Sequence, residues 1–95
     1  IIRGQENIYP AEVEAVISQH TLVQEVAVMG VPDEIFGEQV RAIIVPRSGA
    51  TIQVEDIQNL CRDNLAEFKV PKFIDFRNEN LPRNPGGKIL KRELR

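Results

Sequence analysis

Two apolar runs rich in β-branched residues dominate the hydrophobic pattern of the chain. Residues 23–31 read VQEVAVMGV, and residues 38–46 read EQVRAIIVP. Valine and isoleucine favour strands, and a short, nearly continuous apolar run is typical of a strand that is buried on both faces. We therefore predict two strands with a loop at 32–37 between them. The strands could pair antiparallel across this loop, although a connection of this length does not force the pairing.

Apolar residues also recur at helical spacing on both sides of these strands. Residues 10–20 form the first predicted helix, because Pro10 suits the first helical turn and an apolar face follows it. Residues 54–66 form the second predicted helix, although Gln53 is a weak N-cap. The predicted apolar positions are Ala11, Val13, Val16, Ile17 and His20 in the first helix, and Ile57, Leu60, Cys61 and Leu65 in the second.

The last part of the chain has a less regular pattern. Residues 72–77 read KFIDFR, which predicts a short strand with Phe73 opposite Ile74, and we expect both of its faces to be covered. A turn rich in proline and glycine follows, and then a short helix from Leu90 onward. Ile1 and Ile2 look like the end of another strand. This order of elements predicts an α+β fold, in which helices pack on a small sheet of about three strands.

The composition narrows the class of protein. A chain of 95 residues is one small domain, and its net charge of −2 argues against general attraction to nucleic acid or to a membrane surface. No apolar run approaches the ~20 residues of a membrane span, and no signal peptide is recognisable. The single cysteine, Cys61, allows no internal disulfide, which favours a cytoplasmic protein. Because the chain lacks an initiator methionine, we expect it to be a piece of a longer protein.

The charges are unevenly distributed along the chain. The last third is cationic, and the earlier part is acidic. A stand-alone α+β interaction module, whose basic C-terminal third binds an acidic partner, is therefore one candidate function. The basic residues of this part are Lys69, Lys72, Arg77, Arg83, Lys88, Lys91, Arg92 and Arg95, against the acidic Asp75, Glu79 and Glu93.

A glycine-rich turn near the C-terminus presents one lysine. Pro82 and Pro85 restrict the backbone and remove two N–H donors, so this stretch is not the interior of a helix. The pair Gly86 and Gly87 is the strongest turn signal of the chain. Glycines allow close approach of a ligand, and their N–H groups can face an anion. Lys88 follows directly, and its mobile ammonium group suits a phosphate or a carboxylate.

The same turn does not match the nucleotide-binding P-loop. That motif requires glycine where Pro82 stands and serine or threonine where Ile89 stands. A lysine after two glycines is, from its spacing alone, most often a solvated turn residue. The turn by itself therefore identifies no nucleotide site.

Few other residues suggest chemistry. His20 ends a predicted helix, where a cation is favoured, so we expect a capping or packing role. Cys61 lies on an apolar helix face and is expected to pack in the core. One histidine and one cysteine cannot form a zinc site of the usual ligand number, and we predict no metal site. What remains is a second polar, glycine-containing loop at residues 4–7. The residues alone thus indicate two loops that could bind anions, and they indicate no complete active site.

Six segments in order resemble the C-terminal domain of the adenylate-forming acid–CoA ligases. This superfamily also includes the firefly luciferases and the adenylation domains of peptide synthetases. Each segment is a weak signal alone, but six in the right order form a specific one. The segments are IIRG (1–4), ENIYPAEVE (6–14), VMGVPD (28–33), FGE (36–38), KVPK (69–72) and LPRNPGGKIL (81–90).

The resemblance implies a reaction in two steps. An acid and ATP give an acyl-adenylate and pyrophosphate, and a thiol, that of CoA, then displaces AMP. A large N-terminal domain would hold ATP with Mg²⁺ and the acid, and it would be the partner of this domain. Residues 1–95 would form a single lid that rotates between the half-reactions about a hinge just before Ile1. Alone, the lid is expected to be inactive.

The resemblance also assigns roles to individual residues. Lys88 would bridge the carboxylate and the α-phosphate during adenylation, because a cation in a closed site stabilises developing negative charge. Gly86 and Gly87 would support the turn that carries this lysine. In the other pose, the N-terminal loop would line the tunnel for the pantetheine arm of CoA. This loop consists of Gly4, Gln5, Glu6 and Asn7.

One position departs from the family pattern. Many relatives read Arg-Gly-Gly-Glu-Asn in the N-terminal loop, whereas this chain has Gln5 at the second glycine. Gly4 could take the place of this glycine by a one-residue shift; if it does not, the Gln5 side chain could narrow the thiol tunnel and slow the second half-reaction, while adenylation should be less affected. Within the family, the alternative function is an adenylation domain that loads a carrier protein, and the sequence after Arg95 would distinguish the two.

Overall fold

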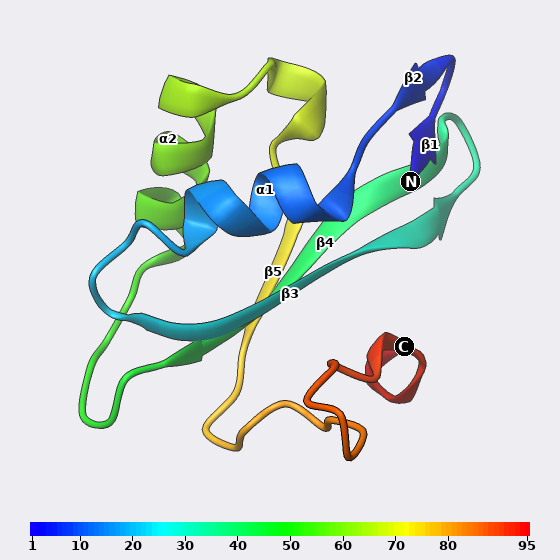
Figure 1. The fold of residues 1–95 in the computed structure, drawn as a ribbon. Helices are drawn as coiled ribbons and strands as arrows, with labels where there is room; N and C mark the ends of the chain where they lie inside the picture. The colour runs from blue at the N-terminus through cyan, green and yellow to red at the C-terminus, as the bar shows by residue number, and fades with distance from the viewer.

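The structure, a computed structural model, describes all residues from 1 to 95 and confirms an α+β fold. Figure 1 shows a long, twisted β-hairpin at its centre, with two helices on one side and the C-terminal end of the chain on the other. No helix is both long enough and apolar enough to cross a membrane. The elements are β1 (Ile2–Arg3), β2 (Glu6–Asn7), α1 (Pro10–Ile17), β3 (Val23–Asp33), β4 (Gly37–Pro46), α2 (Val54–Asn64), η1 (Glu67–Lys69), β5 (Phe73–Phe76) and η2 (Lys91–Leu94), where η denotes a 3₁₀ helix.

The main sheet has three strands in the order β3–β4–β5. β3 and β4 pair antiparallel along their whole length, from Val23 opposite Pro46 to Asp33 opposite Gly37, so the antiparallel pairing is confirmed. The connection is short because the Asp33 carboxylate accepts the N–H groups of Ile35 and Phe36 and closes the turn. β5 runs parallel to β4, and α2 lies in the crossover between them.

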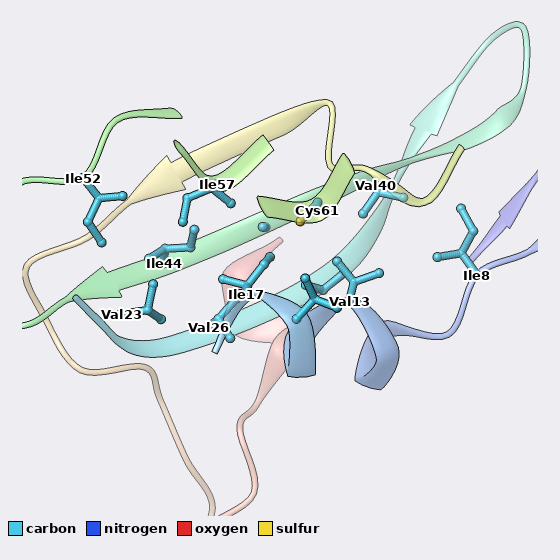
Figure 2. Close-up of a cluster of buried hydrophobic side chains, with 13 residues drawn as sticks. Ile8, Val13, Ile17, Val23, Val26, Val40, Ile44, Ile52, Ile57 and Cys61 are labelled. Atoms are coloured by element: carbon cyan, nitrogen blue, oxygen red, sulfur yellow. The ribbon is translucent and has the colours of Figure 1, made fainter. Parts of the chain in front are cut away.

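The predicted burial of β3 and β4 on both faces is confirmed. Alternate residues of each strand enter two separate apolar clusters. One cluster of 13 buried residues lies between the sheet and the helices, and Figure 2 shows its side chains from α1, α2 and the sheet meeting there. The other cluster has six buried residues and lies under the C-terminal segment, by which we mean residues 81–95. Its members are Ala27, Met29, Ile43, Val45, Leu81 and Leu94.

Both long helices are shorter than their sequence patterns predict. α1 ends at Ile17 rather than at residue 20, because the following amides bond three residues back and tighten the last turn. His20 lies beyond the helix end and accepts the N–H of Leu22 through Nδ1, so it closes the turn into β3 and does not cap the helix. α2 ends at Asn64, and a 3₁₀ turn that the pattern does not reveal, η1, follows it.

Of the predictions for the end of the chain, the coverage of β5 is wrong, and the short helix after it is confirmed. β5 is an edge strand whose Phe73 and Phe76 stay 43% and 37% exposed, so its faces are not both covered. The predicted short helix from Leu90 onward is present as the 3₁₀ helix η2, in which the N–H of Glu93 bonds to the carbonyl of Leu90. So short a segment cannot nucleate an α-helix by itself. Burial of Leu94 in the six-residue cluster holds it in place instead.

Candidate functional site

The predicted glycine turn is the tip of a small hairpin, which we call the Lys88 turn (residues 83–89). Arg83 and Ile89 form a β-bridge at its base. Asn84 organises the tip, because its N–H donates to the Lys88 carbonyl at 2.9 Å and its Oδ1 accepts the Lys88 N–H at 2.9 Å. The backbone of Lys88 is therefore fixed on both sides.

Gly87 supplies the conformation that closes this turn. Its φ is +89°, in the left-handed region where other residues are strained. The N–H of Gly87 donates to the Asn84 carbonyl at 2.9 Å, and the N–H of Lys88 is also occupied. The prediction that the glycine N–H groups face an anion is therefore wrong for Gly87. Of the two glycine amides, only that of Gly86 has no protein acceptor.

The Lys88 side chain is exposed, and its ammonium group makes no hydrogen bond or ion pair. It lies on an open groove of about 980 Å³ between α1, the free edge of β3 and the C-terminal segment. Of the other basic side chains at this groove, Arg83 and Lys91 are paired, whereas Arg92 is exposed and has no partner. Arg83 contacts Glu25 at 2.6 Å, and Lys91 contacts Glu14 at 2.9 Å. Lys88 thus keeps its full charge available for an anionic group outside this domain.

The second predicted loop is the two-residue connection of the β1–β2 hairpin. Arg3 pairs with Glu6, which places Gly4 and Gln5 at the tip. Gly4 has φ +62°, whereas Gln5 has a negative φ. This combination is typical of a type II′ turn, which needs glycine only at its first position. Gln5 therefore fits the turn without backbone strain, and its side chain is exposed.

The β1–β2 hairpin is tied to the tip of the β3–β4 hairpin. The N–H of Ile2 donates to the Glu38 carboxylate at 2.8 Å, and the N–H of Gly4 donates to the Phe36 carbonyl at 2.6 Å. The Arg3 guanidinium stacks over the Phe36 ring at 4.0 Å. These contacts fix the orientation of the loop at residues 4–7.

A second open groove, of about 630 Å³, lies beside this loop. Three cationic side chains, of which Arg62 pairs with Glu67 at 3.5 Å, and two aromatic rings line it, and cations beside aromatic rings suit phosphates and a flat ring system. No local sequence pattern reveals this groove, because its residues come from separate elements and share no spacing. These residues are Arg3, Phe36, Arg62, Phe68 and Lys72.

The structure does not bring the two predicted loops together. The Lys88 turn is attached at Glu25, and the β1–β2 hairpin is attached at Glu38, which pairs with Pro32. Glu25 and Pro32 are seven residues apart on β3, or roughly 23 Å at the rise of a strand. The two loops therefore lie near opposite ends of the long hairpin.

Cys61 lies in the core between α2 and the sheet (Figure 2). Burial raises the pKa of its thiol to about 11, and the neighbouring Arg62 charge opposes this only in part. The predicted packing role is confirmed, because a thiol with such a pKa is neither a nucleophile nor a metal ligand at neutral pH. Nowhere do three or more His, Cys, Asp or Glu side chains converge as metal ligands would.

The fold and most of the sequence match known ligases. The family model of the AMP-binding enzyme C-terminal domain matches residues 12–88. An oxalate–CoA ligase of Arabidopsis thaliana is 47% identical over 97% of this chain. A fatty acyl CoA synthetase of Mycobacterium tuberculosis is 48% identical over the whole chain, with a TM-score of 0.89. The ATP-bound structure of MatB from Rhodopseudomonas palustris is 42% identical over the whole chain, with a TM-score of 0.92.

These matches confirm the family. The chain belongs to the C-terminal domains of the AMP-binding, adenylate-forming CoA ligases. It spans only 18% of the Arabidopsis ligase and of the Mycobacterium synthetase, and 19% of MatB. Residues of this chain thus correspond to about a fifth of such an enzyme.

Proposed function

We propose that this domain is the mobile C-terminal part of an ATP-dependent acid–CoA ligase, and that Lys88 is its adenylation residue. The observation that carries the proposal is the state of Lys88: its backbone is fixed by Asn84, and its ammonium group has no partner within the domain. A cation held in this way is ready to meet an anionic site on another body. The partner body is the larger N-terminal domain of the same enzyme.

In adenylation, a carboxylate oxygen of the acid attacks the α-phosphorus of ATP. The bond from this phosphorus to the bridging oxygen breaks, and pyrophosphate leaves with the electron pair. Both reactants are anionic, so they repel each other as they approach. The Lys88 ammonium group between them offsets this repulsion and stabilises charge that develops in the transition state. We assign Mg²⁺ and most ATP contacts to the larger domain, because this domain gathers no set of carboxylate ligands.

We propose that the loop at residues 4–7 serves the second half-reaction. The CoA thiolate attacks the carbonyl carbon of the acyl-adenylate, and AMP leaves. Gly4 and Gln5 at the hairpin tip would line the path of the pantetheine arm. The groove beside the loop, with Arg3 and Phe36 on its rim, offers charge for the CoA phosphates and an aromatic face for its base.

The separation of the two loops supports a domain that alternates between two poses. They lie roughly 23 Å apart along β3, so a single small active site cannot contact both at once. Rotation of the whole domain would present the Lys88 turn in one pose and the β1–β2 hairpin in the other. A rigid domain suits this role because each loop keeps its shape during the rotation.

The interaction-module alternative is weakened by the charge pairing in the C-terminal third. Lys69, Arg83 and Lys91 bind Glu12, Glu25 and Glu14 of the same domain. The basic surface is thus partly neutralised from within. This alternative predicts that charge changes at Lys91, Arg92 and Arg95 matter as much as a change at Lys88, whereas our proposal predicts that Lys88 dominates.

ATP–pyrophosphate exchange by the full-length parent enzyme, over a panel of carboxylic acids, tests the role of Lys88. We expect Lys88→Ala to lower exchange about 10²–10³-fold, as loss of a group that stabilises transition-state charge does. Arg92→Ala is the matched control, because Arg92 is an exposed cation on the same groove. Undiminished exchange by Lys88→Ala, with an active wild type, would refute the assignment.

Single-turnover reaction of a preformed acyl-adenylate with a thiol tests the second loop. We expect Gln5→Gly to speed thioester formation while ATP–pyrophosphate exchange stays unchanged. CoA and a carrier protein, offered separately as thiol, distinguish the two acceptor classes. Equal rates for wild type and Gln5→Gly would show that this side chain does not narrow the tunnel.

A further inference from the structure

Arg83 makes an unusual set of contacts at the base of the Lys88 turn. Its Nη1 donates to the carbonyl of Gly87, the residue before Lys88, at 2.7 Å. Its Nε and Nη2 both donate to Oε2 of Glu25 on β3, at 3.2 and 2.6 Å. One guanidinium group thus joins the turn to a strand that lies 58 residues away in the sequence.

Glu25 is itself held firmly. Its side chain is only 10% exposed, and its other oxygen accepts the N–H of Leu81 at 3.1 Å. Leu81 is buried in the six-residue cluster against the sheet. The carboxylate is therefore a fixed point of the domain body, and it contacts the C-terminal segment both before the turn and at its base.

No other polar contact ties the tip of the turn to the rest of the domain. Within residues 82–90, all remaining hydrogen bonds are local, such as those of Asn84 with Gly87 and Lys88. These bonds define the shape of the turn but leave its direction free. Packing of Ile89 against the six-residue cluster and the bridge from Glu25 through Arg83 to the Gly87 carbonyl restrain that direction, and the bridge is the polar part of this restraint.

We propose that Arg83, anchored by Glu25, is a positioning residue that aims the Lys88 turn during adenylation. This inference rests on the proposed role of Lys88. Arg83 does not touch the reacting atoms in this account, because its N–H groups are occupied by Glu25 and Gly87. A lysine at the same place could not replace it, since only the planar fork of arginine reaches a carboxylate and a carbonyl together.

The consequence for catalysis follows from the geometry. The Gly87 carbonyl and the Lys88 N–H belong to the same peptide unit, so a shift of that carbonyl moves the lysine backbone directly. A displacement of about 1 Å at a reacting group can lower a rate by 10²-fold. Loss of the bridge should therefore lower the rate of adenylation without changing the affinity for ATP.

The test uses the full-length parent with Arg83→Gln, Arg83→Lys and Glu25→Gln. We expect each to lower kcat of ATP–pyrophosphate exchange roughly tenfold or more. KM for ATP and the reaction of preformed acyl-adenylate with thiol should stay within about twofold of the wild type. Arg77→Gln is the matched control, because Arg77 is a partly exposed arginine whose contact with Glu79, at 3.9 Å, is long. An equal loss in both half-reactions would overturn the proposal, since it would indicate general damage to the domain.

A double-mutant cycle gives a readout that a merely structural role would not produce. If Arg83 acts through Lys88, Arg83→Gln should have no further effect on exchange in a Lys88→Ala background. Fully additive losses would overturn the positioning role. If Lys88→Ala alone leaves exchange unchanged, the proposed function itself fails.

Limited proteolysis with a lysine-specific protease needs no enzymatic activity. It therefore distinguishes failure of the Arg83 bridge from failure of the proposed role of Lys88. We expect Arg83→Gln and Glu25→Gln to speed cleavage after Lys88 at least severalfold, identified by fragment mass, while Arg77→Gln does not. Unchanged cleavage would overturn the bridge as the element that holds the turn. Faster cleavage together with unaltered exchange would show that the turn is held but that its direction does not matter for adenylation.

Discussion

The two faces of the sheet are covered in different ways. On one face, α1 and α2 pack over a cluster of 13 buried residues with help from partly buried neighbours such as Leu60 and Ile74. On the other face, a segment with a single 3₁₀ helix covers six buried residues. Two side-chain ion pairs also hold the second cover, and they link Arg83 to Glu25 and Lys91 to Glu14.

This difference assigns different tasks to the two faces. The helical face carries most of the apolar burial, which is the main source of stability. The C-terminal face carries the Lys88 turn on a segment with little regular structure and few buried side chains. Segments of this kind open locally with lower free energies than the core. The domain thus combines a stable scaffold with an exposed lysine turn on a more weakly attached cover.

Ile57→Ala on the helical face should have the largest effect on stability. Ile57 is fully buried between α2 and the sheet, so its truncation leaves a cavity. We expect a loss of about 2–5 kcal/mol in the free energy of unfolding, measured by urea denaturation. Ile35→Ala is the control, because Ile35 is 85% exposed at the hairpin tip. A loss no larger than that of the control would contradict the division between the faces.

Leu81→Ala on the C-terminal face should act more locally. Leu81 is buried, but the segment that carries it can shift to fill part of the space. We expect a smaller global loss than for Ile57→Ala, with faster hydrogen exchange at residues 83–90 and unchanged exchange in α1 and α2. Uniformly faster exchange throughout the domain would show that the two faces unfold as one unit.

Gly87→Ala tests the turn on this weaker face. Because Gly87 has φ +89° and open space around it, an added Cβ introduces backbone strain and no collision. The strain is about 1–2 kcal/mol, and we expect it to appear as faster hydrogen exchange at Lys88. Gly86→Ala is the matched control, since Gly86 has an ordinary φ and only one contact, with Asn84, at 3.4 Å. Equal effects of the two changes would argue against the turn geometry.

Alkylation of Cys61 tests the packing of the helical face, and its thiol should make the smallest contribution to stability of the groups compared. Its thiol pKa is raised by burial from 9.0 to about 11, so it should resist alkylation at pH 8 in the folded domain and react readily in denaturant. The folded state disfavours the thiolate, so this contribution to stability is complete below pH 9 and is lost as the pH rises towards 11. Comparing how the free energy of unfolding of wild type and of Cys61→Ala changes at alkaline pH measures this contribution. Rapid alkylation of the folded domain would contradict a tight helical face.

Local patterns predicted the elements that depend on local forces. The β-branched runs identified β3 and β4, and the glycine pair identified the Lys88 turn, because these preferences act within a few residues. Boundaries were less predictable: α1 ends at Ile17 because the chain must turn there to enter β3, a demand that helical periodicity does not contain. The exposure of β5 is not predictable from local pattern either, because Phe73 and Phe76 are residue types of a core and only the tertiary structure leaves them partly exposed.

The sequence by itself determined the fold class, the family pattern and the identity of Lys88 as the residue of interest. Only the tertiary structure decided which groups surround it. The pairing of Arg83 with Glu25 joins residues 58 positions apart, and the groove beside the β1–β2 hairpin draws on several separate elements. Contacts across such separations leave no local pattern, because they arise when the folded sheet brings distant side chains to the same edge.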